Sequence, residues 1–168
     1  MDKVIFSINT INEKIGKLAS WLTTALVVLI VIDVVLRYFL KDTAAWIIEL
    51  EWHFFAIIFL LGGAYAFKED KHVRVDLFYS NFSERDKAWV NLLGSLLLLV
   101  PWCIAIMWFA EKYARLSFQI GEGSPDPGGL PARYIIKSVI VIGFLLLSLQ
   151  AVAVVLQSIL TLQNTEKG

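Results

Sequence analysis

Four ionisable side chains fall close together within or beside two long apolar runs. Asp33 and Arg37 are one helical turn apart, and so are Glu49 and His53. An acid four residues before a base is the favourable order for an ion pair on a helix. Ionisable groups inside a membrane span are costly and by default indicate function. These residues therefore predict a charge cluster that locks a helix hairpin or docks a partner, or else a relay for protons or ions.

The link between the two apolar runs is short, so the runs are expected to form an antiparallel hairpin. Arg37 closes the first run and Glu49 opens the second. We therefore expect an interhelical ion pair between Arg37 and Glu49 at the shared end of the hairpin. One histidine and two carboxylates in a single helical turn are too few ligands to predict a metal site.

Other side chains that carry chemistry are scattered. His53 and His72 are the two histidines, and at roughly 28 Å apart along a helix they cannot share one haem iron. Cys103 stands alone in an apolar run and is interpreted as a packing residue. Pro101 predicts a kink in the third run, which in a spanning helix is usually structural. We expect no catalytic residue, no cofactor and no metal.

Membrane spans are the elements that must position these residues. Of the 168 residues, 58% are hydrophobic, above the roughly 45–50% of soluble domains, and the mean hydropathy is +0.68. Several runs reach the roughly 20 apolar residues that a helix needs to cross a bilayer. The predicted spans are about 18–40, 44–67, 88–110 and 138–162. The fold class is therefore an all-α membrane protein with four transmembrane helices, in a single domain over residues 1–168.

Residues 1–17 have a different pattern. Apolar residues recur every three or four positions from Val4 to Leu18, and polar residues occupy the positions between them. This period is typical of an amphipathic helix at a membrane surface, so we expect an interfacial helix that leads into the first span. The first span is longer than a signal-peptide core and no small-residue cleavage site follows it, which indicates a permanent anchor.

Two connections carry recognisable cap and turn signals. Ser83 and Asp86 match a capping box and predict the start of the third helix. The longest connection, about 111–137, first continues the preceding helix to Ile120. The stretch 121–131 that follows holds three of the four prolines and four of the ten glycines. Such a composition breaks a helix and predicts an external loop, with Pro131 where the last helix begins.

Basic residues predict the orientation of the chain. An even number of spans places both termini on one side, which then carries nine Lys and Arg residues against six on the other. Lys and Arg are in excess on the cytoplasmic side of membrane proteins, so both termini are expected in the cytoplasm. The formal net charge is zero, which argues against a nucleic-acid partner because phosphate binding needs a basic surplus.

The inner end of the second run carries a family resemblance. A Gly/Ala-rich helix end is followed by a basic–acidic pair and then by a His-Val-x-Val-Asp run. The residues that carry the resemblance are Gly62-Gly-Ala64, Asp33, Arg37-Tyr38, Trp46, Glu49-Leu50 and His72-Val-Arg74-Val-Asp76. With these, the chain resembles the small, DctQ-like membrane subunit of tripartite ATP-independent periplasmic (TRAP) transporters over nearly its whole length. The loop at 124–131 is longer than in many members.

The resemblance implies a role in uptake across the bacterial inner membrane. Such a subunit pairs with a large multi-span membrane subunit that holds the substrate and sodium sites. A periplasmic binding protein delivers the substrate, typically an organic acid, and an ion gradient drives transport. The resemblance thus implies a non-catalytic scaffold that braces the large subunit within the lipid bilayer.

The signature also predicts local structure. Val73 and Val75 alternate with polar residues, which fits an extended or turning segment at the cytoplasmic interface. Asp76 is expected to accept hydrogen bonds from exposed backbone amides, and Arg74 to face lipid phosphate or a partner. The full set of structural or partner-interface candidates is Asp33, Arg37, Glu49, His53, His72, Arg74 and Asp76.

Two other classes of function stay open. The first is a membrane anchor subunit of a redox or signalling complex; the absence of a paired-histidine haem site in the sequence counts against it. The second is a self-contained ion carrier that uses Asp33, Arg37 and Glu49, and it predicts transport by the purified chain alone.

Overall fold

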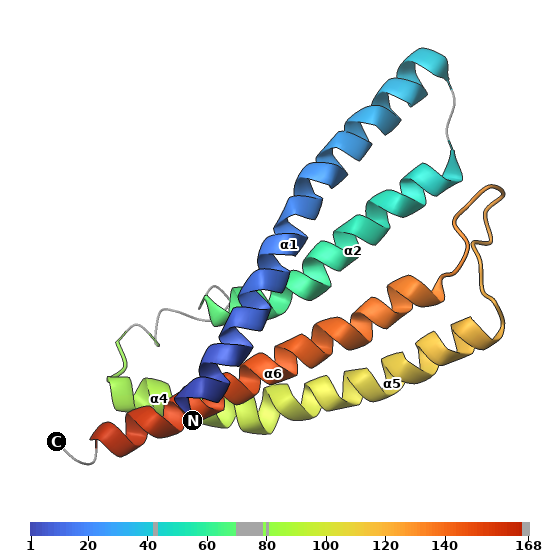
Figure 1. Cartoon of the computed structure of the whole chain (residues 1–168). Helices are drawn as coiled ribbons and strands as arrows, with labels where there is room; N and C mark the ends of the chain where they lie inside the picture. The colour runs from blue at the N-terminus through green and yellow to red at the C-terminus, as the bar shows by residue number, and fades with distance from the viewer. Residues whose placement is uncertain (42–43, 70–78, 80, 166–168) are drawn as a thin grey trace.

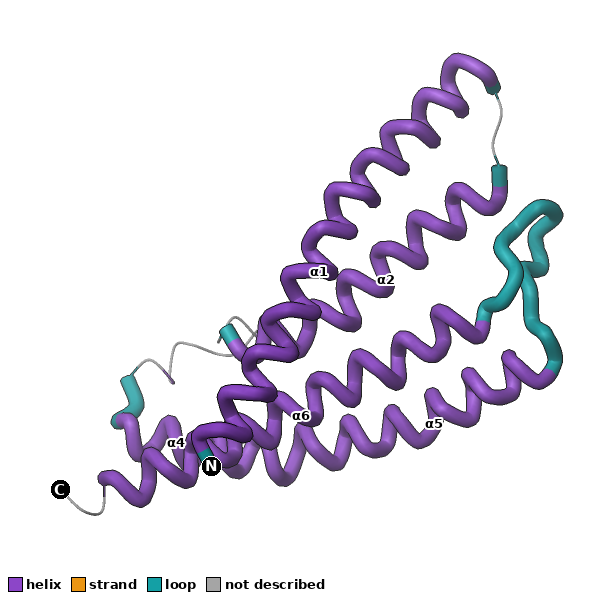
Figure 2. The backbone as a smooth tube through the Cα atoms, viewed as in Figure 1, coloured by secondary structure: helices purple, strands orange, loops and turns teal. Residues whose placement is uncertain are grey.

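A computed structural model describes residues 1–41, 44–69, 79 and 81–165 of the chain. This part contains four helices that are long and apolar enough to cross a membrane. Figure 2 shows helices joined by loops, and no strand occurs within the described ranges. The predicted all-α membrane fold with four spans is therefore confirmed.

The helices are longer than the predicted spans. They are α1 (Asp2–Val35), α2 (Ala45–Lys68), α4 (Glu84–Leu93), α5 (Val100–Gln119) and α6 (Tyr134–Thr165). Two wider, π-helical segments extend them: η1 (Leu36–Leu40) follows α1, and η2 (Gly94–Leu99) joins α4 to α5. The third span is thus continuous from Glu84 to Gln119.

The predicted N-terminal helix is present and belongs to α1, without a break before the first span. One face of it, which includes Ile5, Ile8 and Asn12, is buried against the rest of the chain. The neighbouring stripe of Val4, Ile11 and Leu18 is exposed. The helix therefore offers one face to the protein and keeps an apolar stripe free, while its location in the membrane interface stays a prediction.

Two helical hairpins, α1–α2 and α5–α6, make up most of the molecule (Figure 1). Helix α6 is the common neighbour, because it contacts α1, α2, α4 and α5. The hairpins cross near the N-terminus of α1 and diverge toward the opposite end, where α2 begins and α6 begins (Figure 1).

Small residues let the helices approach closely where they cross. A Cβ atom at Gly143 in α6 would lie 2.8 Å from the carbonyl oxygen of Leu60 in α2. Ala64 of α2 and Ala151 of α6 are almost fully buried. These residues belong to the small-residue patches in the sequence, which in membrane helices favour close packing.

The ends of the third and fourth spans follow local sequence signals. Ser83 caps α4, with its Oγ accepting a hydrogen bond from the Asp86 amide at 3.2 Å, so the helix start predicted at Ser83 is confirmed. Pro101 lacks an amide hydrogen and its ring crowds the preceding turn. The turn before it widens into η2, in which the Val100 amide bonds the carbonyl of Ser95. The disturbance predicted at Pro101 therefore takes the form of a π-helical segment.

The connection between α5 and α6 begins where expected and ends later than expected. Helix α5 continues to Gln119, as predicted. Helix α6 begins at Tyr134, three residues beyond Pro131. Ala132 has a φ of +61°, which is a left-handed conformation that a right-handed helix cannot contain. The helix therefore cannot begin before this residue.

Candidate functional site

Glu49 lies in the second turn of α2 and holds the long connection between α5 and α6. Its side chain is almost fully buried, with the residue only 4% exposed. Its carboxylate accepts hydrogen bonds from Ser124 Oγ, from the Leu130 amide at 2.6 Å and from Arg133 Nη2 at 3.0 Å. We call Glu49, Ser124, Leu130 and Arg133 the Glu49 hub. The hub joins α2 to the loop that precedes α6.

The loop is folded so that its donors converge on one carboxylate. The Ser124 amide bonds the carbonyl of Leu130 at 3.0 Å, and the Asp126 amide bonds Ser124 Oγ at 3.0 Å. Gly129 passes beside the hub, where a Cβ atom would lie 2.8 Å from Glu49 Oε2. The same Cβ atom would lie 2.4 Å from Ser124 Cβ, so a side chain at 129 would crowd both Ser124 and Glu49.

A second ion pair secures the base of the same loop. The Lys137 ammonium donates a hydrogen bond to Glu122 and lies 3.7 Å from the centre of the Tyr113 ring. This hydrogen bond lowers the pKa of the Glu122 carboxyl group below its ordinary value, although partial loss of water contact opposes the shift. Charged groups thus fix the loop at two points, one on α2 and one on α6.

The expected ion pair between Arg37 and Glu49 is wrong. Arg37 donates to Asp33, one turn earlier on its own helix, and Glu49 is turned toward the loop. Residues 49 and 51 lie about 200° apart around a helix, so when Glu49 faces the loop, Glu51 faces the other side. Glu51 indeed interacts electrostatically with Asp33 and Arg37. The acid of α2 that faces α1 is therefore Glu51, which the sequence interpretation did not select.

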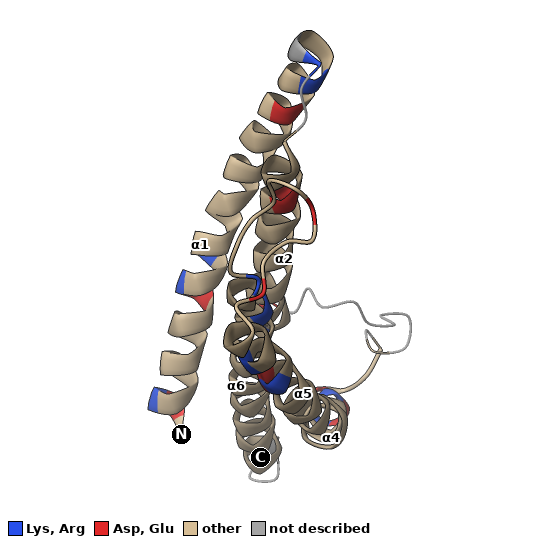
Figure 3. Cartoon of the chain, turned by 90° about the vertical axis from the view of Figure 1, so that its right-hand side faces the viewer, with Lys and Arg blue, Asp and Glu red and all other residues tan. Residues whose placement is uncertain are grey.

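Asp33, Arg37 and Glu51 form a second cluster, near the end of the α1–α2 hairpin. Asp33 is 2% exposed, whereas about half of the Arg37 side chain is exposed. Asp33 Oδ1 and Glu51 Oε1 are buried and have no hydrogen-bond partner among the described residues. Figure 3 shows charged residues near this end of α1 and an uncharged stretch along the helix before them. The cluster holds an internal ion pair rather than a link between α1 and Glu49.

His53 lies beside the hub without joining its carboxylate. Its Nδ1 atom is within hydrogen-bond distance of the backbone carbonyl of Glu49, and its ring lies 3.9 Å from that of Trp52 between centres. His53 thus packs along α2. The remaining predicted residues, His72, Arg74 and Asp76, lie outside the residues that the structure describes.

A cluster of carboxamides joins α1 to the middle of α6. Asn12 Nδ2 donates to Gln150 Oε1 at 2.7 Å, and Gln150 Nε2 donates to Asn9 Oδ1 at 2.9 Å. Asn12 is 1% exposed and Gln150 is 2% exposed. We call Asn9, Asn12 and Gln150 the amide clasp. Its signal in the sequence is a glutamine inside a span that has no charged residue from 138 to 162, together with two asparagines at helical spacing.

An ion pair near the clasp ties α1 to the other end of α2. Lys68 donates to Glu13 at 2.7 Å, and Glu13 also accepts from Lys17 at 2.6 Å. Lys68 stands in the last turn of α2. Helix α1 is therefore held by neutral side chains on α6 and by a charged side chain on α2.

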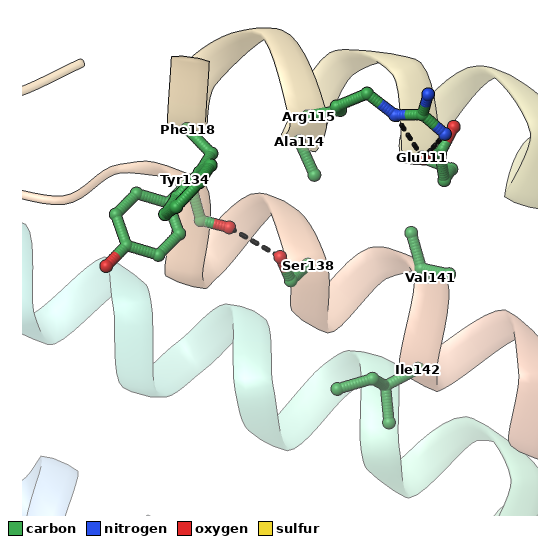
Figure 4. A pocket seen from close by; sticks show the side chains of 8 residues that line it. All are labelled: Glu111, Ala114, Arg115, Phe118, Tyr134, Ser138, Val141 and Ile142. Atoms are coloured by element: carbon green, nitrogen blue, oxygen red, sulfur yellow. Dashed lines mark hydrogen bonds and ion pairs between the residues drawn. The ribbon is translucent and has the colours of Figure 1, made fainter. Parts of the chain in front are cut away.

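The surface between α5 and α6 carries a shallow groove of about 420 Å³. Figure 4 shows its lining, in which Arg115 bonds Glu111 of its own helix and the Ser138 hydroxyl bonds the Tyr134 carbonyl. The rings of Phe118 and Tyr134 meet edge to face, 5.0 Å apart between centres. Arg115, Glu111 and Ser138 are thus engaged within their own helices and do not converge on the groove as the polar groups of a substrate site do.

Comparison with known families gives one match of wide extent. The family model described as "Tripartite ATP-independent periplasmic transporters, DctQ component" matches residues 26–161. That range contains Glu49, the loop and Gln150, and it begins within α1 after Asn9 and Asn12. No curated protein has significant sequence similarity to the chain.

Proposed function

Because the chain belongs to the DctQ component family of tripartite ATP-independent periplasmic transporters, we propose that it is the non-catalytic scaffold subunit of such a transporter. It pairs with a large multi-span membrane subunit, which carries the transport site. A periplasmic binding protein delivers an organic acid, and an ion gradient drives uptake. The match over residues 26–161 is the observation that carries this proposal.

The use of the charged side chains supports a scaffold role. Glu49 is engaged by the loop, Asp33 by Arg37, and Glu13 by Lys17 and Lys68. A transport site is instead built from polar groups, or from broken helix ends, that converge near the midplane. These three acids are therefore used to hold the helices and the loop in place.

The orientation follows the excess of basic residues, with both termini in the cytoplasm and the loop at 121–133 on the periplasmic side of the inner membrane. Residues 125–128 at the loop tip are exposed. The Glu49 hub holds this tip in one position above α2 and α6. We propose that the fixed tip forms part of the surface that meets the periplasmic binding protein.

The pairing can be tested by purifying the tagged chain from its native membrane in mild detergent and identifying what accompanies it. A stoichiometric multi-span partner is expected, and uptake of an organic acid in proteoliposomes is expected only when both proteins and the binding protein are present. Purification with a redox or signalling enzyme would favour the anchor alternative. Transport by the chain alone would favour the ion carrier.

The orientation can be tested separately with an Asp126→Cys variant, because Cys103 is buried and does not compete for a polar reagent. A membrane-impermeant maleimide is expected to label Cys at 126 in intact spheroplasts. Labelling only after lysis would show that the loop lies in the cytoplasm.

A further inference from the structure

Two buried carboxylate oxygens of the α1–α2 hairpin have no hydrogen-bond partner among the described residues. They are Asp33 Oδ1 on α1 and Glu51 Oε1 on α2. Asp33 is only 2% exposed, and it interacts electrostatically with Glu51. Both acids stand in helices that are long and apolar enough to cross the membrane. Burying an ionised oxygen without a donor is costly, so the cluster of Asp33, Arg37 and Glu51 needs something that the described side chains do not supply.

The cluster also has one acid more than it has cations. Arg37 donates to Asp33 Oδ2, and this ion pair balances one of the two carboxylates. Asp33 and Arg37 are also the described charged groups that interact with Glu51. The hairpin diverges from α5 and α6 toward this end (Figure 1), so those helices lie farther from the cluster. With both acids ionised, the cluster would carry a net negative charge inside spanning helices, which is unfavourable.

The burial of the two oxygens limits what can relieve this charge. The chain itself covers Asp33 Oδ1 and Glu51 Oε1, so a lipid headgroup or a side chain of a partner does not reach them. A metal ion takes several ligands, and the described residues hold no group of three or more His, Cys, Asp or Glu side chains that could bind one. A proton needs neither an open cavity nor a set of ligands, and brief local opening of the helices admits it.

We propose that the cluster binds one proton and that Glu51 carries it. Asp33 stays ionised because Arg37 binds it, and the proton removes the second negative charge. The neutral carboxyl group of Glu51 also gains an O–H donor. Neighbouring acids commonly hold a single proton between them, since the ionisation of one opposes that of the other. The cluster is then neutral within the membrane, and the inference does not depend on which protein the chain pairs with.

The proton has a structural consequence for the hairpin. Helices α1 and α2 contact each other, and Asp33 and Glu51 stand on their facing sides. Without the proton, like charges would oppose each other across this contact, in surroundings of low dielectric constant where repulsion is strong. The proton therefore allows two acids to remain between the helices without separating them.

Infrared spectroscopy tests for the proton directly, because the carbonyl stretch of a protonated carboxyl group is separate from the bands of carboxylates and amides. The full-length chain is purified in dodecylmaltoside, which has no carbonyl group, and is measured at neutral pH. The wild type is expected to show one such band, which shifts when glutamate is labelled with ¹³C and is lost in Glu51→Gln. Glu111→Gln is the matched control and is expected to keep the band, because Glu111 is paired with Arg115 at the surface.

The opposite results would overturn the assignment to Glu51. They are a wild-type chain without the band, a band that persists in Glu51→Gln, and a band that shifts with labelled aspartate instead of labelled glutamate. A band that appears only after sodium is replaced by choline would instead assign the cluster to a sodium ion.

Changing the charge balance tests whether the proton belongs to the cluster. In Asp33→Asn, Arg37 has Glu51 as its remaining acid, so Glu51 is expected to lose the proton and the band to disappear. In Arg37→Gln, no cation replaces the proton, and the band is expected to remain. A band that persists in Asp33→Asn would show that burial of Glu51 alone holds the proton, and would overturn the role of Asp33 and Arg37.

Discussion

At the loop end of α2, a carboxylate gathers donors from a loop, whereas at the N-terminal end of α1, three carboxamides connect two helices. Glu49 receives two side-chain donors and one backbone amide. Gln150 bonds both Asn9 and Asn12 through side chains, and Asn12 Nδ2 also donates a longer hydrogen bond to the backbone carbonyl of Leu146 at 3.5 Å. Both sites are buried and both join segments far apart in the sequence.

The difference between the sites follows from the backbone each one meets. A loop has free amides and adjustable side chains, so it can supply the several donors that a buried carboxylate needs. Helices bond their own backbone amides and carbonyls, so every hydrogen bond between these two helices needs at least one side chain. Neutral carboxamides carry donor and acceptor together, which lets them pair between helices without burying a charge. We therefore expect the order of the loop to depend on the charge of Glu49. We expect the stability of the clasp to depend on the pairing of neutral donors and acceptors.

Removing the charge at the hub has the largest expected effect. In Glu49→Gln, the amide cannot accept the bonds of Ser124, Leu130 and Arg133 in the same way, and it adds donors among donors. Limited proteolysis of the loop at 121–133 is expected to accelerate on the order of tenfold, because charge-assisted hydrogen bonds are lost. Glu51→Gln, two residues away on the opposite side of α2, serves as the control. Equal protection of the loop in wild type and Glu49→Gln would show that Glu49 does not hold it.

Crowding the hub without changing its charge has a smaller effect. In Gly129→Ala, the added Cβ atom meets Glu49 Oε2 and Ser124, so the loop shifts and is cut several-fold faster by the same protease. In Gly123→Ala, the nearest atom to the added Cβ lies 3.9 Å away, and cleavage at the wild-type rate is expected. If the protease cut both variants at the same rate, the close approach of Gly129 to Glu49 and Ser124 would not determine how firmly the loop is held.

Breaking the amide clasp destabilises the helices without releasing the loop. Asn12→Leu leaves Gln150 with an unmatched buried amide, which costs about 1–2 kcal/mol between spanning helices. Reversible unfolding in mixed detergent measures the loss. The Asn12→Leu/Gln150→Leu double variant is expected to be more stable than the sum of the single changes, since it removes both partners. Simple additivity would show that the two amides do not interact.

Acidification has the smallest expected effect, and it acts on the Glu122–Lys137 ion pair at the base of the loop. The folded-state pKa of Glu122 is lowered by Lys137, so its pair contributes stability above the unfolded carboxyl pKa of about 4.3. That contribution is lost as the pH falls through the folded pKa. Loop proteolysis by an acid-active protease is therefore expected to rise below about pH 4, less steeply in Lys137→Met, which lacks the pair at every pH. The same acid dependence in Lys137→Met and wild type would exclude this pair as the cause.

Much of the fold was accessible from local sequence signals. The four apolar spans, the Ser83 cap, the end of α5 and the loop at 121–131 depend on residues that are close together in the chain, and the structure confirms them. The start of α6 differs because the left-handed conformation of Ala132 depends on how the loop returns to Glu49.

The candidate site was only partly accessible. Glu49 was selected as an acid near the end of a span that would form an ion pair with a distant residue, and it does form one. The predicted partner, Arg37, was wrong, because Arg37 pairs with Asp33 and Glu49 faces the loop. Arg133, 84 residues after Glu49 in the sequence, supplies the charge instead.

By itself, the sequence determined that this chain crosses the membrane as apolar helices and where those helices begin and end to within a few residues. It also marked Asp33, Arg37 and Glu49 as charged groups that would need partners, but it did not mark Glu51, Asn12 or Gln150. These properties follow from burial energies and backbone bonding, which act over one or two turns. The tertiary structure decided the partners: Ser124, Leu130 and Arg133 for Glu49, and Gln150 for Asn12. Each pairing depends on the rotation of a helix about its own axis and on the path of a distant segment. The packing of the whole chain sets both, and no short stretch of residues encodes them.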